Sequence, residues 1–389
     1  MSSKGWTRRE FLALSGSAAF TAAVSLRAAA SDPALAGTVR PASLPSARLS
    51  NRSPLYEEAF VLDANTLASI GALQSDGDAS GALKAIRHSG LTALKSTMGG
   101  GNGSFEQAVA DIAATQTLIE KHPDLFLKVT GPDALDRAKP QNKIAIILSF
   151  EAVSMLEGKI DRIDLFRQLD VLVMQLSYNR KSPFGCGCLD GDSEGVTPLG
   201  RQAIAKMNAV GVALDLSHAN AQTTKDGIAL STKPAIITHA GCRGVFNHPR
   251  NKTDRDMKAL AEKGGVMGIY MLPFLTPDNR QPMLADYMLH LTYALNVCGE
   301  DHVGIGTDSM FFQVSGEDLR EVAAQEAERR KAGIGAPGEN RPPYIPDINT
   351  PRKLEFVADA LLKKGYGTAV VEKVLGLNFR RTLKEIWSI

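Results

Sequence analysis

Two short apolar segments that both end in histidine constrain this chain more than any other feature. The first is Val212–His218 and the second is Pro234–His239. An apolar run that ends in polar residues is typical of a buried parallel strand whose carboxyl end opens into a site. The segment 219–233 between them is long enough for one crossover helix. The sequence therefore predicts adjacent strands with two imidazoles at one rim, either as zinc ligands or as buried structural histidines.

Apolar runs alternate with amphipathic segments from Ala59 onward. The predicted strands are Ala59–Leu62, Leu91–Leu94, Ile144–Phe150, Val171–Leu176, Val212–Leu216, Ala235–Thr238, Gly265–Ile269 and Val303–Gly306. The predicted helices include Ser104–His122, Pro198–Val210 and Asp254–Lys263. This regular alternation predicts a distorted α/β barrel of the (β/α)8 TIM type, in a single catalytic domain over residues 55–389. An open doubly wound sheet is the alternative, but no Gly-rich phosphate loop follows the first strand.

The first 54 residues are interpreted as a targeting segment followed by a linker. Thr7–Leu12 contains a twin-arginine motif, an Ala- and Ser-rich stretch follows to Leu26, and Ala28–Ala30 offers small-residue cleavage sites. We therefore expect a signal peptide over residues 1–30, a linker over residues 31–54, export by the twin-arginine machinery and a periplasmic location. No later segment reaches the length of a membrane span.

The composition is that of an ordinary globular enzyme. The net charge is +2, from 44 basic and 42 acidic residues, which provides no basic field for nucleic acid. Four cysteines in 389 residues do not make a disulfide framework, even in an oxidising compartment. Cys186-Gly187-Cys188 is interpreted as a pair of loop thiols rather than as a zinc knuckle.

Carboxylates end two further predicted strands. Ile144–Phe150 runs into Glu151, and Val303–Gly306 runs through Thr307 into Asp308. An unpaired buried carboxylate costs several kcal/mol, so each acid requires a salt bridge or a metal. Enzymes with a barrel fold place their chemistry at the carboxyl ends of the strands. The fold thus predicts that the two carboxylates and the two histidines converge.

These motifs together resemble the membrane (renal) dipeptidase family, peptidase family M19, among the amidohydrolase-like metal-dependent hydrolases. The resemblance covers nearly all of the chain after the linker and depends on the order and spacing of the motifs. The segments that carry it are 148–151, 195–201, 207–218, 238–239, 249–254, 304–308 and 376–381.

The resemblance implies a barrel with two zinc ions bridged by a glutamate. Glu151 matches the bridging position, and His218 and His239 match the histidines that hold one metal. Asp308 matches the acid that orients the attacking water and handles its proton. Arg250 matches the arginine that binds the terminal carboxylate of the substrate, a task that suits a bidentate guanidinium.

The chain departs from the family pattern at the first strand. The family has Asp-Gly-His-x-Asp there, and this chain has Asn65 and Leu67 in place of the histidine and the second aspartate. Neither side chain is a good zinc ligand. Tyr178 stands where the family has a histidine that contacts the substrate. We therefore predict one Zn²⁺ per chain, held by Glu151, His218 and His239, with Asn65 and Tyr178 as substrate-binding residues.

Three classes of function remain open. The favoured one is a zinc-dependent hydrolase that cleaves the amide bond of dipeptides or of a small peptide-like substrate. The others are a non-peptidase enzyme that modifies a peptide-derived metabolite and a catalytically silent binding protein. The segment Gly316–Pro346 is expected to cover the pocket or to join a subunit interface, which leaves a homodimer open. His88, His122, His290 and His302 are interpreted as surface or capping residues.

Overall fold

The chain forms a parallel barrel surrounded by helices. The computed structural model describes residues 53–67, 70, 79–101, 103–277 and 280–388. Its sheet has the strand order β1-β2-β4-β5-β6-β7-β8-β9, and a short additional strand, β3, pairs with β4. The backbone N–H of Ala64 donates to the carbonyl of Ile305 over 2.9 Å, which brings the end of the first strand to the last. The predicted (β/α)8 barrel is confirmed.

The strands are short, and all their pairings are parallel. Their bounds are β1 Leu62–Asp63, β2 Ala93–Met98, β3 Phe126–Lys128, β4 Ile144–Phe150, β5 Val171–Gln175, β6 Ala213–Asp215, β7 Ile236–Ala240, β8 Val266–Ile269 and β9 Val303–Ile305. Each of the eight predicted strands corresponds to one of these, whereas β3 was not predicted from the sequence.

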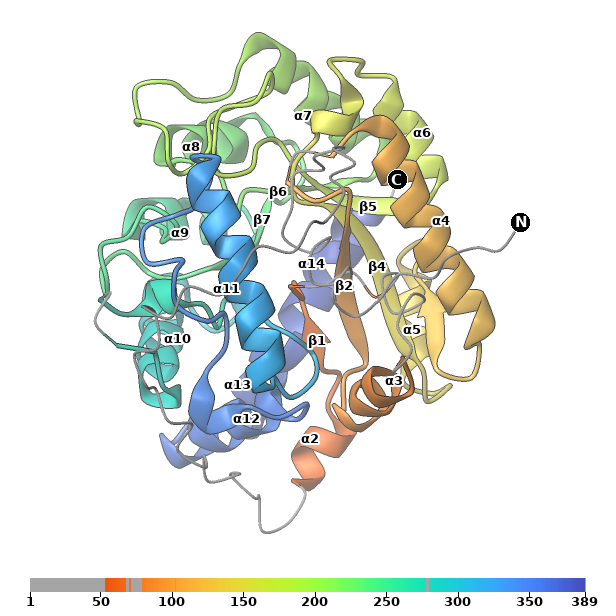
Figure 1. Cartoon of the computed structure of the whole chain (residues 1–389), viewed down its shortest axis with the longest axis vertical. Coiled ribbons are helices and arrows are strands. Elements are labelled where there is room, and N and C mark those ends of the chain that lie inside the picture. Colours follow the sequence, from red (N-terminus) through yellow and green to blue (C-terminus); the bar gives the residue numbers. More distant parts are fainter. Residues whose placement is uncertain (1–52, 68–69, 71–78, 102, 278–279, 389) are drawn as a thin grey trace, which may run out of the picture.

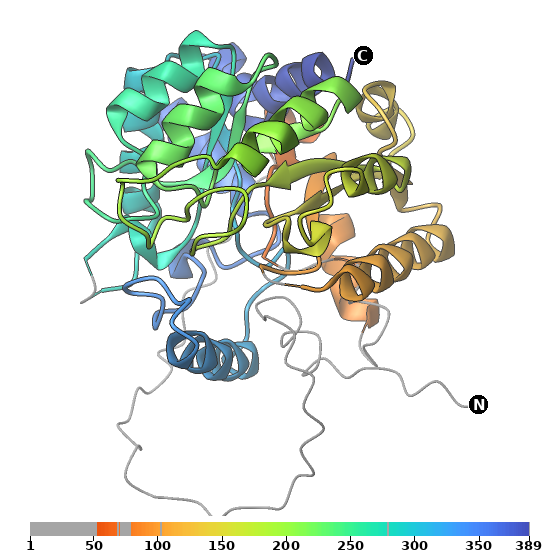
Figure 2. The same ribbon diagram turned by 90° about the horizontal axis from the view of Figure 1, so that it is seen from above.

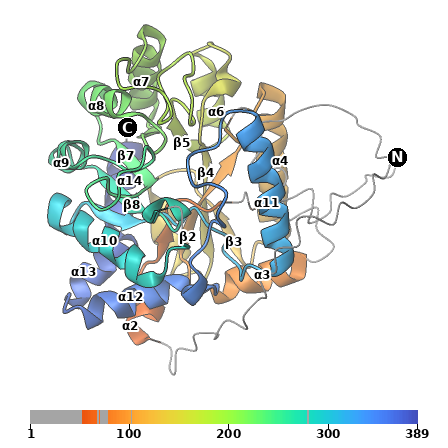
Figure 3. The same cartoon turned by 60° about the vertical axis from the view of Figure 1, so that its left-hand side comes forward.

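Helices follow most of the strands and cover the outside of the barrel (Figure 1, Figure 2). They are α2 Pro54–Glu58, α3 Ala79–His88, α4 Phe105–Lys121, α5 Asp133–Ala138, α6 Arg162–Gln168, α7 Pro198–Val210, α8 Ala221–Leu230, α9 Asp254–Glu262, α10 Leu284–Cys298, α11 Gly316–Lys331, α12 Lys353–Lys363, α13 Thr368–Glu372 and α14 Asn378–Trp387. Helix α11 crosses in front of the barrel (Figure 1, Figure 3).

Local sequence sets the ends of α7, whose predicted bounds are those observed. The side chain of Thr197 accepts a hydrogen bond from the backbone N–H of Gly200, and Pro198 occupies the first turn. Gly211 ends the helix with a φ of 66°, a left-handed conformation that glycine adopts without a Cβ penalty. Because the helix stops there, the chain enters β6 directly and brings His218 to the rim.

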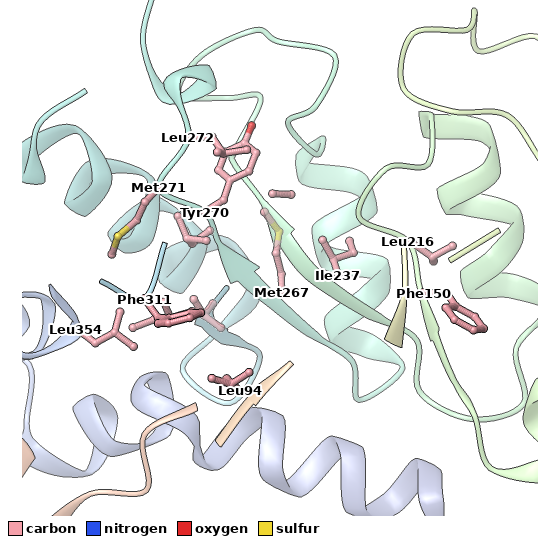
Figure 4. Packing of buried hydrophobic residues seen from close by; sticks show 14 of the residues in the cluster. Leu94, Phe150, Leu216, Ile237, Met267, Tyr270, Met271, Leu272, Phe311 and Leu354 are labelled. Atoms are coloured by element: carbon pink, nitrogen blue, oxygen red, sulfur yellow. The ribbon is translucent and has the colours of Figure 1, made fainter. Parts of the chain in front are cut away.

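Side chains on alternate positions of the strands pack on different sides of the sheet. Leu94 and Phe150 belong to the large apolar cluster that also contains residues from the surrounding helices (Figure 4). Ala93 and Ile147 belong to a second cluster, which includes Phe379 and Trp387 of α14. Helix α14 therefore covers the end of the barrel at which the strands begin, and the opposite rim stays available for a site.

The interpretation of residues 1–54 as a signal peptide and linker falls outside the described residues, apart from Ser53 and Pro54. Among the residues that the structure describes, no helix is both long enough and apolar enough to span a membrane. The four cysteines are all free and buried.

His290 corrects one sequence interpretation, because it is buried instead of lying at the surface. It projects from α10, its Nδ1 accepts from the backbone N–H of Cys242 over 3.0 Å, and its Nε2–H donates to the carbonyl of Leu275 over 3.0 Å. Burial is the largest cause that lowers the pKa of His290 to about 4. The neutral imidazole thus links the segments that follow β7 and β8.

We expect this histidine to make the fold sensitive to acid. The unfolded chain binds a proton near pH 6.5, whereas the folded chain binds it only near pH 4. The free energy of unfolding should therefore fall as the pH drops through this window, by up to about 3 kcal/mol from this residue. Denaturant titrations between pH 4 and 8 measure the effect. In His290→Asn the pH slope should be smaller than in the parent protein, and an unchanged slope would contradict the assignment.

Candidate metal centre

Three predicted ligands converge at the carboxyl ends of the strands. Glu151 follows β4, His218 follows β6 and His239 lies within β7. One ligand atom from each residue lies within 4.8 Å of the other two. His218 and His239 are buried and Glu151 is largely buried, with 13% of its side chain exposed. Two imidazoles and a carboxylate at this spacing match the ligand types of an open zinc site.

Hydrogen bonds fix which ring nitrogens carry the protons. The Nδ1–H of His218 donates to Oδ1 of Asn179 over 2.7 Å, and the amide nitrogen of Asn179 donates to the carbonyl of Ile334. The Nδ1–H of His239 donates to the hydroxyl of Thr238 over 2.9 Å, since that hydroxyl gives its own proton to Asp215. Both Nε2 atoms are therefore left with lone pairs.

These two lone pairs face each other, because the Nε2 atoms are only 3.0 Å apart. Burial is the largest cause that lowers the pKa of both histidines well below the usual value, so neither ring carries a second proton at neutral pH. Two unprotonated nitrogens at this distance repel each other, and a cation bound to both would relieve the repulsion. The residues present thus fit a metal ion that is bound at both Nε2 atoms and at the Glu151 carboxylate.

Asp215 connects the three strand ends that carry this arrangement. Its Oδ1 accepts hydrogen bonds from the backbone N–H and the hydroxyl of Ser217, at 3.0 and 2.5 Å, and from the backbone N–H of Thr238. Its Oδ2 accepts from the hydroxyl of Thr238 and from the amide of Gln175. The hydroxyl of Ser217 also accepts from the backbone N–H of His239. One buried carboxylate therefore positions both histidines.

Asp308 and Asn65 form the other side of the rim. The amide nitrogen of Asn65 donates to Oε1 of Glu151 over 2.8 Å and to Oδ1 of Asp308 over 2.9 Å. Oδ2 of Asp308 lies 3.8 Å from Nε2 of His239. Burial, followed by the charge of Glu151, raises the pKa of Asp308 to about 7. Asp308 also has a φ of 48°, a strained conformation for a residue other than glycine.

Arg250, predicted to bind substrate, is buried beside His218. Its Nη1 donates to the carbonyl of Ser217 over 2.6 Å, and its Nη2 donates to Nε2 of His218 over 3.2 Å. The ammonium of Lys252 donates to the carbonyls of Leu216 and Ala219, which strengthens the same loop. In this arrangement Arg250 contacts a candidate metal ligand, so its role in substrate binding stays a prediction.

A pocket opens over these residues and encloses about 640 Å³ of empty space, part of which is open to solvent. Leu67, Glu151, Tyr178 and Asp308 line its inner part. Its outer wall includes Glu326 and Arg329 of α11 and residues of the segment that follows. The predicted segment 316–346 therefore covers the pocket; whether it also joins a subunit interface stays a prediction.

Tyr178 joins this outer wall to the metal centre. Its ring stacks on the His218 ring with 4.1 Å between centroids, and its hydroxyl accepts a hydrogen bond from Nη2 of Arg329 over 3.1 Å. Arg329 also pairs with Glu339 at 2.7 Å. Burial raises the pKa of Tyr178 above its usual value, so the phenol stays protonated. The wall thus offers both donors and acceptors to a polar ligand.

Comparison with known proteins decides the family. The sequence profile of the membrane dipeptidases, peptidase family M19, matches residues 80–324. The chain belongs to this family. The match spans every predicted metal ligand and also Asp308, so the membrane dipeptidase resemblance noted in the sequence is confirmed.

Relatives and solved structures extend the likeness. A dipeptidase named tcpJ from Claviceps purpurea is 23% identical over 288 residues, which are 73% of this chain and 61% of that protein, less than two thirds of its length. An amidohydrolase from Pseudomonas aeruginosa is 29% identical with a TM-score of 0.71, over 86% of this chain and 98% of the other. A metallopeptidase from Rhodobacter sphaeroides, liganded with a phosphinate mimic of L-Ala-D-Ala, has a TM-score of 0.67 at 19% identity and covers 85% and 99% of the two chains. At that identity the last likeness shows the fold alone.

Several residues of this membrane dipeptidase site were not predicted from the sequence. Asn179 directly follows Tyr178. Its position as a polar residue after a predicted strand could have identified it as a site residue. Arg329 lies in a helix rich in Glu and Arg, which resembles a solvated surface helix, so nothing local indicated its position in the pocket. Lys95 lies within the apolar β2 and is buried. A charged residue inside a predicted buried strand could also have been recognised from the sequence.

Asp215 provides a direct test of how the site is held. We expect Asp215→Ala to lower the affinity for a divalent metal such as zinc by about 10–100-fold, because the variant keeps all three candidate ligands but loses the carboxylate that orients two of them. Competition with a chromophoric chelator measures the affinity.

The matched control is Asp63→Ala. Asp63 accepts from the backbone N–H and the hydroxyl of Thr307, which makes a similar buried clamp between β1 and the end of β9. Both variants should lose stability, but Asp63→Ala should keep more of its metal affinity. An equal loss in the two variants would assign the effect to general destabilisation.

Proposed function

We propose that this chain is a metal-dependent hydrolase that cleaves the amide bond of dipeptides or dipeptide-like substrates with a single zinc ion. The observation that carries the proposal is the pair of unprotonated Nε2 atoms 3.0 Å apart, with the carboxylate of Glu151 beside them. Membership of a metallopeptidase family and the overlying pocket support the same conclusion.

Three protein ligands suit an open catalytic site, which keeps one position for water or substrate. A zinc ion bound there supplies Lewis acidity, which polarises a carbonyl and makes water a stronger acid. Asn65 donates its amide hydrogens to Glu151 and Asp308, and Leu67 lines the pocket without offering a ligand atom. These contacts support one ion rather than two.

Asp308 is the residue best placed to move a proton. It lines the pocket, and its Oδ2 is 3.8 Å from Nε2 of His239. A carboxyl group with a pKa of about 7 exchanges a proton readily at neutral pH, so it can accept a proton from water and return it to the leaving amine. The amide of Asn65 donates to Oδ1 of Asp308 and to Glu151, which holds the two carboxyl groups side by side.

The residues that surround the candidate metal ligands are placed to bind the substrate. Arg250 donates to the Nε2 atom of His218 that would hold a metal, so its guanidinium would be available for a substrate carboxylate once that atom served as a ligand. The protonated phenol of Tyr178 can donate to a carbonyl oxygen, or to the oxyanion that develops from it. Asn65 fixes the carboxylates that face the substrate.

The proposal predicts zinc-dependent hydrolysis of dipeptides. Release of amino acids from a dipeptide panel, measured with metal-free and zinc-loaded protein, checks it. Asp308→Asn should keep its zinc and lose about 10²–10⁴-fold in kcat, because the amide cannot take up a proton. His218→Ala should lose both zinc and activity, and Asp124→Asn, a change at a remote exposed acid, should match the parent.

Two results would contradict the proposal. One is full zinc occupancy in His218→Ala, which would place the ion elsewhere. The other is a zinc-loaded parent protein that hydrolyses none of the dipeptides. Near-stoichiometric zinc without turnover would favour an enzyme that modifies a peptide-derived metabolite, and the absence of zinc would favour a binding protein.

We also propose that the protein is exported to the periplasm by the twin-arginine route. The support is the motif at Arg8 and Arg9 with the small-residue stretch that follows. Replacement of both arginines by lysine should leave the precursor inside the cell, and fractionation with an antibody measures this. Unchanged export would contradict the proposal.

A further inference from the structure

Lys95 is a charged residue in the interior of the barrel. Its side chain is on the same side of β2 as Ala93, which packs in the interior cluster, and only 2% of the residue is exposed. Its ammonium donates to the hydroxyl of Ser149 on β4 over 3.1 Å and weakly to the hydroxyl of Thr97 over 3.4 Å. Within the described part of the chain, no carboxylate forms an ion pair with it.

An ammonium that is buried among hydroxyl groups is costly, so its charge must be offset through space. The nearest connected acids are those of the metal centre. The hydroxyl of Thr97, which contacts the ammonium, donates to Oε1 of Glu151 over 3.1 Å. The same oxygen accepts from the amide of Asn65, which also donates to Asp308.

The positive charge of Lys95 therefore lies in the interior of the barrel. The path from its ammonium to the carboxylate of Glu151 runs through a single hydroxyl group, that of Thr97. Ala93 and Ile147, which lie on the same side of the sheet, are apolar. If the side chain at position 95 only filled space, we would expect it to be apolar as well. The lysine thus has an electrostatic role that a methionine of similar length would lack.

We propose that Lys95 is a built-in counter-cation of the Glu151–Asp308 pair, which weakens the attraction of the site for divalent cations. The proposal rests on the single-zinc function proposed above. Lys95 is a positioning residue, because it acts on the two carboxylates through Thr97 and through space and does not touch the pocket.

The test compares zinc binding by the full chain and by Lys95→Met. Loss of one buried positive charge near the site should tighten the binding of the first zinc ion at least tenfold. Chelator competition gives the affinity and elemental analysis gives the stoichiometry, so both readouts are independent of catalysis.

Lys353→Met is the matched control. Lys353 is also a buried lysine, but its ammonium donates to the carbonyl of Met310, and Asp63 is the acid that acts on its pKa. Zinc binding in this variant should stay within twofold of the parent. Lys95→Ala is the second neutral variant should Lys95→Met fail to fold, and thermal melting shows which variants are folded.

The outcomes separate the two proposals. Zinc affinity and stoichiometry in folded Lys95→Met or Lys95→Ala that equal those of the parent would overturn the counter-cation role and leave the single-zinc hydrolase in place. If the parent protein binds no zinc but the Lys95→Met variant does, the counter-cation role is supported and the zinc-dependent hydrolase is overturned. Absence of binding in both proteins would overturn both.

Discussion

The buried carboxylate of Asp215 is the constraint on which the rest of this site depends. A closed parallel barrel brings the carboxyl ends of its strands to one rim, but it does not fix the directions of the side chains there. Asp215 does so, because it accepts hydrogen bonds from Ser217 and Thr238, and these residues precede the two histidines. The imidazoles are thus held with unprotonated nitrogens in contact before any ion arrives, which is preorganisation in a strict sense.

Much of the fold could be predicted from the sequence, because the signals were local. The apolar run 144–150 is long and unbroken, and β4 has those bounds. Helix α7 has a capping threonine, a proline in its first turn and a glycine after its end, so its limits could be predicted as well. The convergence of Glu151, His218 and His239 followed from strand ends that a barrel must bring together. By contrast, β3 has three residues and no pattern that distinguishes it from a loop.

The partners of the site residues could not be predicted, because they come from distant parts of the chain. Asn179 accepts from His218, which lies 39 positions away, and Arg329 donates to Tyr178 from 151 positions away. The motif around Arg250 indicated substrate binding but not the hydrogen bond to His218. Asn65 and Leu67 were noted in the sequence as candidate departures from the family pattern, whereas the contact of Asn65 with both carboxylates depends on the closure of the barrel.

Closure of the barrel has a consequence for how the molecule reaches this state. The bond from Ala64 to the carbonyl of Ile305 joins segments 241 positions apart, and the ring of Phe379 packs where a Cβ on Gly304 would lie. Such non-local contacts cost loop-closure entropy before they stabilise anything, so they form late and slowly. Half of the barrel would leave apolar strand edges exposed to other chains. Partial folding should therefore be the stage at which this protein is most prone to aggregate.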